Sequence, residues 1–151
     1  MHRPHPGGRA GLRHFYIGFA RVHSRLLRST RGRPSRLTPR LRCLVLETIG
    51  RRSHRRRQTV LLYMPTGGGF VVLASNFGRE HPPAWWLNLE ATPEAAVLLA
   101  GRRVEVRARE LQGEERAAAL REAVAYNRQW RGYARTLHRH LPVVRLEQRS
   151  P

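Results

Sequence analysis

Short apolar segments separated by glycine and proline occupy the chain from residue 41 to residue 147, and this pattern restricts the fold to one built mainly of strands. Each segment is short and rich in β-branched or aromatic residues, which is typical of strands. Because the segments follow one another closely, they favour an antiparallel sheet, and PTGGG (65–69) predicts the tip of a hairpin. The segments are LRCLVLETI (41–49), TVLLYM (59–64), GFVVLAS (69–75), AAVLLA (95–100), RRVEVRARE (102–110) and LPVVRLE (141–147).

Helical patterns lie before and between these segments. Residues 113–126, GEERAAALREAVAY, predict the longer helix near the C-terminus, with acids in its first turn. Residues 81–93 predict a short helix or turn, and apolar positions three and four apart from Leu12 to Leu27 predict an N-terminal amphipathic helix. We therefore expect an α+β, mainly β protein: a small antiparallel β-barrel with helices added to it.

The positive charge is concentrated in the N-terminal part. The formal net charge is +19. Residues 1–57 contain 16 arginines and the single acid Glu47, whereas residues 58–151 contain 13 arginines and nine glutamates. With room for one core in 151 residues, we expect residues 1–40 to form a basic tail, amphipathic helix and linker, and residues 41–151 to form the barrel domain. The N-terminal helix either docks on this domain or lies in an anionic membrane interface.

Cellular location and partners are constrained by what the sequence lacks. Cys43 is the only cysteine, so no internal disulfide can form, and a reducing cytoplasm is the natural compartment. Arginines interrupt every apolar run long enough for a signal peptide or a membrane span. We expect a cytoplasmic protein, with peripheral attachment to the inner face of the plasma membrane as the alternative. Nucleic acid is an unlikely partner because no known binding motif is present. A homodimer and a monomer both remain open.

Catalysis by side chains alone is poorly supported. The chain has no aspartate for a hydrolase triad and no nucleophile elbow. Only His138 and His140 lie close together among the histidines, without a cysteine partner, so no metal site is expected. Neither the dinucleotide-binding nor the Walker sequence occurs. If the protein is an enzyme, a cofactor must supply the chemistry.

Two stretches have the composition of a ligand site. In GRRSHRRRQ (50–58), a glycine follows a predicted strand and five arginines precede the next one. A tight turn of this kind directs backbone N–H groups and guanidinium groups at one place, which suits a phosphate, although a solvated charge run is the alternative. In ASNFGREHPPAWWLNLEATP (74–93), small polar residues precede two tryptophans. This suits a planar heterocycle with polar edges, and the alternative is that Trp85 and Trp86 are core residues.

Taken together, these stretches resemble the deazaflavin-dependent nitroreductase family, split β-barrel proteins of actinobacteria. The family pattern begins with Gly-Arg-Arg/Lys-Ser/Thr-Gly-x-Pro-Arg-x-x-Pro-Leu followed by an aromatic residue. It continues with a block close to ASxGGxxxxPxWxxNLxAxP and ends with a tyrosine and R-x-IPVVVLEP. The resemblance covers residues 41–147. The residues on the pattern are Gly50, Arg51, Arg52, Ser53, Arg57, Leu61, Tyr63, Ala74, Ser75, Gly78, Pro83, Trp85, Asn88, Leu89, Ala91, Pro93, Tyr133, Arg139, Leu141, Pro142, Val143, Val144, Leu146 and Glu147.

The resemblance implies a split barrel that binds coenzyme F-420, an 8-hydroxy-5-deazaflavin with a phosphodiester and an oligoglutamate tail; FMN is less expected. It implies that Arg51, Arg52, Ser53 and Arg57 hold the phosphate and the start of the tail. Gln58, Thr59, Val60, Leu61 and Leu62 would line one side of the cofactor, Ala74, Ser75 and Asn76 would meet the deazaflavin edge, and Ala84, Trp85, Trp86, Leu87 and Asn88 would cover the groove. Tyr133 would be the catalytic residue that positions the substrate or donates a proton, with Trp130 shaping the same pocket.

The implied function is that of an oxidoreductase that transfers hydride from reduced coenzyme F-420 to a hydrophobic small-molecule acceptor, of quinone or nitroaromatic type. The alternative is a non-catalytic or altered family member that binds a lipid or flavin at a membrane surface. Three residues of the first block depart from the family pattern: His54 replaces glycine, and Arg56 and Val60 replace proline. The glycine would permit a positive φ at position 54, which histidine tolerates less well.

Overall fold

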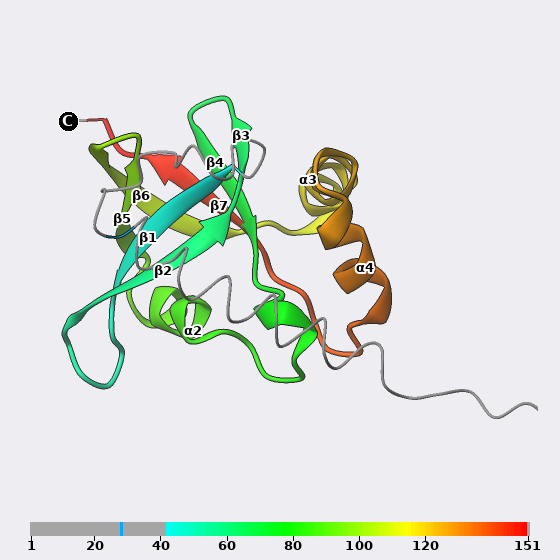
Figure 1. Ribbon diagram of the computed structural model, residues 1–151, viewed down its shortest axis with the longest axis horizontal. Coiled ribbons are helices and arrows are strands. Elements are labelled where there is room, and N and C mark those ends of the chain that lie inside the picture. Colours follow the sequence, from blue (N-terminus) through cyan, green and yellow to red (C-terminus); the bar gives the residue numbers. More distant parts are fainter. Residues whose placement is uncertain (1–27, 29–41, 151) are drawn as a thin grey trace, which may run out of the picture.

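One curled, seven-stranded antiparallel sheet forms the body of the protein (Figure 1). The computed structural model describes Arg28 and residues 42–150, so the predicted N-terminal helix and linker lie outside the described residues. The strand order is β2-β1-β5-β6-β7-β4-β3, which makes β2 and β3 the two edges. The expected mainly β, split-barrel fold is confirmed. The strands are β1 (Cys43–Ile49), β2 (Arg56–Leu62), β3 (Met64–Thr66), β4 (Gly69–Leu73), β5 (Glu94–Leu99), β6 (Arg102–Glu110) and β7 (Val143–Gln148).

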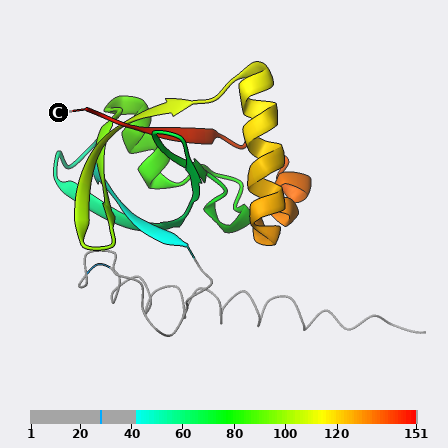
Figure 2. The same cartoon turned by 90° about the horizontal axis from the view of Figure 1, so that it is seen from above.

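The two faces of the sheet bury different apolar clusters. Figure 2 shows helix α2 (Ala84–Ala91) inside the curve of the sheet, where both of its tryptophans join the main core. Side chains at alternate positions of β1 and β4, such as Leu46 and Val72, fill this core from the sheet. Helices α3 (Gly113–Tyr126) and α4 (Arg128–Thr136) lie side by side at one end and cover a second cluster with Val71 and Trp130.

Two elements differ from the sequence-based expectation. The segment TVLLYM is not one strand, because β2 begins earlier, at Arg56, pairs with β1 and ends at Leu62, and β3 then pairs with β4. The change occurs at Tyr63, whose N–H still donates to the carbonyl of Arg42 at 3.2 Å. The predicted hairpin at 65–69 is confirmed, with Thr66 opposite Gly69. No element was expected over residues 128–136, where the chain forms α4.

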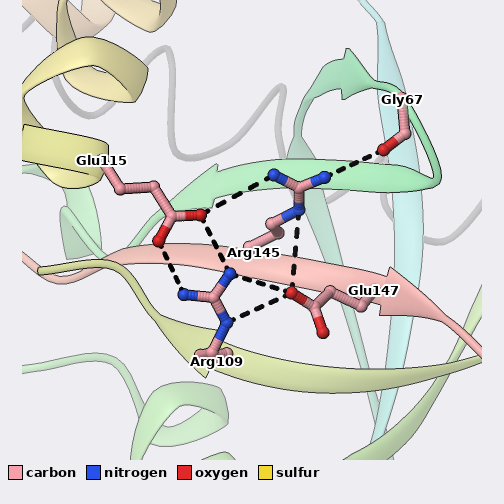
Figure 3. Close-up of polar contacts among 5 residues, drawn as sticks. All are labelled: Gly67, Arg109, Glu115, Arg145 and Glu147. Carbon is pink, nitrogen blue, oxygen red and sulfur yellow. Dashed lines mark hydrogen bonds and ion pairs between the residues drawn. The ribbon is translucent and has the colours of Figure 1, made fainter.

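A surface ion-pair network fixes the start of α3 on the sheet (Figure 3). Arg109 of β6 donates to both carboxylate oxygens of Glu115, at 2.8 and 2.9 Å, and to Glu147 of β7 at 2.9 Å. Arg145 donates to the carbonyl of Gly67 at 2.9 Å, so the β3–β4 hairpin is included. These hydrogen bonds lower the pKa of Glu115. Each pair is exposed and contributes little alone, but the network joins β6, β7, α3 and the β3–β4 hairpin.

In the described part of the chain, no helix is both long and apolar enough to span a bilayer. Within Arg28 and residues 42–150, no three histidine, cysteine or acidic side chains come together as metal ligands.

Candidate cofactor site

A cavity of about 790 Å³ lies where β1 turns into β2, and α2 forms one of its walls. This volume is in the range of pockets that hold cofactors and other small ligands. Nine of its thirteen lining residues are ones that the resemblance assigned to the cofactor. These are Arg51, Arg52, Ser53, Arg57, Gln58, Thr59, Ala84, Trp85 and Asn88; the other four are Arg28, Glu47, Gly50 and Arg56.

The turn from Gly50 to Arg55 is closed by its own backbone. Gly50 N–H donates to the carbonyl of Arg55 and His54 N–H donates to the carbonyl of Gly50, both at 2.8 Å. A Cβ on Gly50 would lie 2.5 Å from Ser53 Oγ, so glycine leaves room for this hydroxyl. His54 has φ 54°, in the left-handed region. The histidine therefore adopts the conformation that glycine would allow there, at a cost of about 1–2 kcal/mol.

The turn concentrates hydrogen-bond donors at the mouth of the cavity. Ser53 Oγ accepts from Arg57 Nη2 at 3.2 Å and from Arg55 N–H at 3.4 Å, so the hydroxyl helps to orient Arg57. Arg51 and Arg52 occupy the same turn and line the same cavity. Guanidinium groups bind phosphate and carboxylate oxygens through paired, charge-assisted hydrogen bonds. The donor set therefore fits the phosphodiester and acidic tail of coenzyme F-420.

Asn88 connects the turn to the core. Its Oδ1 accepts from Arg51 N–H at 3.1 Å, and its Nδ2 donates to Thr48 Oγ1 of β1 at 3.1 Å. Only 5% of the residue is exposed; its bond to Thr48 is buried, and its bond to Arg51 is partly buried. Although Asn88 lines the cavity, its amide is already used to hold α2, β1 and the arginine turn in one arrangement.

The two tryptophans of α2 have different positions although both are buried. Their ring centroids are 6.5 Å apart with the planes at 75°, and each residue is 6% exposed. Trp85 lines the cavity, whereas Trp86 packs in the main core without being part of the lining. The expectation of core packing therefore holds for both, and Trp85 also offers an aromatic surface to a ligand.

The remaining predicted residues lie outside the cavity lining. Beyond Thr59 the strand β2 continues away from the turn, and its side chains alternate between the faces of the sheet, so that Leu61 packs on the inner core. Ala74, Ser75 and Asn76 follow β4, and Tyr133 and Trp130 are on α4 within the outer cluster. The residues outside the lining are Val60, Leu61, Leu62, Ala74, Ser75, Asn76, Trp86, Leu87 and Tyr133.

Glu47 is a cavity residue that the sequence patterns did not identify. It lies opposite Gln58 in the β1–β2 register, and Gln58 Nε2 donates to its Oε2 at 3.1 Å. Arg103 Nη2 donates to its Oε1 at 3.1 Å, and Arg56 Nη1 lies 3.8 Å from the same oxygen. Burial by itself raises the pKa of Glu47, but these hydrogen bonds and charges outweigh it and lower the pKa. A lone acid among sixteen arginines in residues 1–57 was the signal available in the sequence.

Relatives in sequence were found for most of the chain. The sequence profile of the F420H(2)-dependent quinone reductase family matches residues 19–148. The F420H(2)-dependent quinone reductase Rv1261c of Mycobacterium tuberculosis is 30% identical over 141 residues, which are 91% of this chain and 95% of that protein. A protein of Mycobacterium tuberculosis named as a putative F420H(2)-dependent quinone reductase, Rv3178, is 28% identical over 106 residues, 70% of this chain and 89% of that protein.

Solved structures give the same fold. An F420-H2 dependent reductase, FDR-A, has a TM-score of 0.64 and 28% identity, with 70% of this chain and 93% of that chain covered. HutZ, the heme storage protein of Vibrio cholerae, has a TM-score of 0.57 over 83% of this chain and 89% of its own, at 14% identity, so it shares the fold alone. The family match covers the cavity and the barrel, and it confirms the expected class of enzyme and cofactor. The chain belongs to the F420H(2)-dependent quinone reductase family and is an F-420-dependent oxidoreductase.

Proposed function

We propose that this protein transfers hydride from reduced coenzyme F-420 to a small hydrophobic acceptor, with quinones as the main class and nitroaromatics as the second. The observation that carries this proposal is the arginine-lined cavity beside Trp85, in a chain that belongs to a quinone reductase family. The cavity offers cationic donors to the acidic half of the cofactor and an aromatic wall further in. Few other cofactors combine a phosphodiester and several carboxylates with a flat ring.

The chain's own residues would bind, orient and shield the reacting groups. Arg51, Arg52, Ser53 and Arg57 would hold the phosphate and the start of the tail at the mouth of the cavity. When bound, the reduced deazaflavin supplies a hydride to the acceptor. A quinone that gains a hydride is a hydroquinone monoanion, and it needs one further proton to become the neutral hydroquinone. Tyr133 is the residue that we assign to position the acceptor or donate this proton.

For the rest of the cofactor, we propose the contacts that the family resemblance implies. Side chains of β2, the residues after β4 and helix α2 would extend the groove from the cavity toward the deazaflavin ring. The residues concerned are Gln58, Thr59, Val60, Leu61, Leu62, Ala74, Ser75, Asn76, Ala84, Trp85, Trp86, Leu87 and Asn88.

We also propose how the chain is organised as a whole. Residues 1–40 would form a basic segment separate from the barrel domain of residues 41–151, and peripheral contact with an anionic membrane would bring the protein close to apolar acceptors. A solved structure described as a domain-swapped dimer, 28% identical with a TM-score of 0.64 over 70% of this chain and 79% of its own, supports a homodimer. If the protein instead binds a lipid or flavin, acyl chains or FMN should remain with it through purification.

Titration with coenzyme F-420 tests the cofactor assignment. Wild-type protein should quench or shift the deazaflavin fluorescence at micromolar concentration, and FMN in a parallel titration should bind more weakly. Arg57→Ala should weaken F-420 binding about 10- to 100-fold, because it removes charge-assisted hydrogen bonds worth about 1.5–3 kcal/mol.

Arg55→Ala is the matched control, because Arg55 lies in the same turn but does not line the cavity. This variant removes the same charge as Arg57→Ala. Because Arg55 should act on the cofactor only through long-range electrostatic attraction, the affinity for F-420 should change by less than about threefold. Equal losses in the two variants would reduce the site to a non-specific basic patch, and no response of wild type to F-420 would refute the assignment.

A further inference from the structure

The turn after β4 has an unusual backbone. Asn76, Phe77 and Gly78 have φ values of 46°, 55° and 77°, so three consecutive residues are in the left-handed region. Glycine adopts this region readily, whereas the Cβ atoms of Asn76 and Phe77 make it unfavourable. A non-glycine residue persists in such a conformation only where its surroundings hold it there, and such residues concentrate at binding and active sites.

Arg139 is the main brace of this turn. Its Nη2 donates to the carbonyls of Ala74 and Ser75, both at 3.0 Å, and its Nε donates to the carbonyl of Arg79 at 2.9 Å. Its Nη1 donates to the carbonyl of His140 at 2.9 Å. One guanidinium therefore holds the backbone on both sides of Phe77. Burial of this group lowers the pKa of Arg139, which remains charged at neutral pH.

Two further contacts hold the ends of the same turn. Asn76 Nδ2 donates to the carbonyl of His81 at 2.9 Å. Gly78 packs against the ring of Tyr133, since a Cβ there would lie 3.3 Å from Tyr133 Cδ1. The turn is therefore positioned directly against the residue that we assign to the acceptor side of the reaction.

Phe77 is the residue that this arrangement presents outward. It is 52% exposed, and it is one of two large hydrophobic residues exposed in the described part of the chain. About half of the residue stays exposed, so burial stabilises it only in part, and its backbone conformation is unfavourable; folding alone therefore does not account for a phenylalanine at this position. A flat apolar side chain is suited to packing on a flat apolar ligand.

We propose that Phe77 is a specificity-determining contact for the hydrophobic acceptor, held in place by Arg139 as a positioning residue. This inference rests on the proposed function, because the acceptor side is assigned through Tyr133. Phe77 packs on the ring of a quinone next to Tyr133, and the braced turn keeps the phenyl group in position before the acceptor arrives. This contact strengthens binding of the acceptor, and Phe77 takes no part in the transfer of hydride or proton.

The test is Phe77→Gly, which removes the side chain and the steric cost of a positive φ at this position. Thermal unfolding of the cofactor-free variant should shift upward by about 2–4 °C, because glycine adopts the left-handed region readily. With F-420 and a naphthoquinone, KM for the quinone should rise about tenfold while kcat stays within about twofold. This is the result expected when the lost contact stabilises the bound substrate and the transition state equally. The affinity for F-420 should be unchanged.

Ala100→Gly is the matched control, because Ala100 has φ 51° in the exposed turn between β5 and β6. It should raise the unfolding temperature similarly and leave KM alone. Arg139→Lys loses the forked hydrogen bonds and should raise KM for the quinone with a smaller change in kcat. A Phe77→Leu variant, which keeps an apolar side chain, should recover part of the affinity.

A binding measurement separates this inference from the proposed function. Quenching of tryptophan fluorescence by a naphthoquinone is followed in cofactor-free wild type and in Phe77→Gly, and the variant should bind about tenfold more weakly. If F-420 does not bind wild type, the proposed function fails while this comparison still stands. If both proteins bind the quinone equally, or wild type does not bind it, the role of Phe77 is refuted.

Discussion

At the level of single residues, Glu47 shows how an acid is accommodated in a cationic cavity. An unpaired carboxylate here would repel the acidic half of the cofactor. Instead, each of its oxygens accepts a hydrogen bond, from Gln58 on one side and from Arg103 on the other. Only 9% of the residue is exposed, so these partners replace much of its hydration. The pairing keeps Glu47 ionised and fixes the side chain of Gln58 at the cavity wall.

Replacement of Glu47 by glutamine should therefore have a pH-dependent cost. Because the folded pKa lies below the unfolded value, the carboxylate stabilises the protein fully above about pH 4.3, and this is lost as pH falls through the folded pKa. Urea unfolding should show Glu47→Gln to be less stable than wild type by roughly 1–2 kcal/mol at pH 7, and the difference should narrow toward pH 3. The exposed Glu90 of α2 provides the control, Glu90→Gln. A difference that does not vary with pH would contradict this account.

Residues that act within one turn could be predicted from the sequence, and residues that act across strands could not. Arg51, Arg52, Ser53 and Arg57 are close in the chain, so the strands predicted on either side placed them in one turn, although their composition alone fitted a solvated charge run as well. Glu47 depends instead on the β1–β2 register and on Arg103, which is 56 positions away. Likewise, the brace of Phe77 by Arg139 spans more than sixty residues and leaves no local pattern.

At the level of elements, hydrophobic patterning located the barrel strands but not the break at Tyr63 or helix α4. The break arises because β2 follows one edge of the sheet and β3 the other, and curling of the sheet is a property of the whole fold. Helix α4 is amphipathic, but it is only nine residues long, contains a glycine and has Trp130 and Tyr133 as its only large apolar residues, so its pattern is too short to stand out in the sequence. Its buried side, with Trp130, is stabilised by packing against the outer cluster rather than by helix propensity.

The β4–β7 pairing gives a test of the sheet at this level. Gly69 lies opposite Glu147, and a Cβ at position 69 would lie 2.1 Å from the backbone carbonyl oxygen of Leu146. Gly69→Ala must therefore push the two strands apart, and it should lower the free energy of unfolding by about 1–3 kcal/mol or more. Gly67→Ala in the same hairpin has open space within 4 Å and should have little effect in the same urea titration. Equal stability of the two variants would show that the strands are not in contact as described.

At the level of the whole molecule, fold and charge carry different information. The fold is shared with a heme storage protein at 14% identity, so it does not define the ligand. The net charge of +19 is a property of this sequence, and it attracts any polyanion at low salt. Specific binding of F-420 must therefore be distinguished from general attraction. The cavity makes this possible because several arginines line one cavity rather than being spread along a surface.

Salt dependence separates the two kinds of binding. If the protein contacted 6–10 phosphates of a duplex, its affinity for DNA would fall about 10³–10⁵-fold between 50 and 200 mM salt. Binding of F-420 should fall by less than about tenfold over the same range, because a small ligand releases few counterions and its ring also packs in the groove. The two affinities are measured side by side, by deazaflavin fluorescence and by anisotropy of a labelled duplex. DNA binding that survives 200 mM salt while F-420 binding is lost would favour a nucleic-acid partner, and it would show that the arginines of this chain do not form a cofactor site.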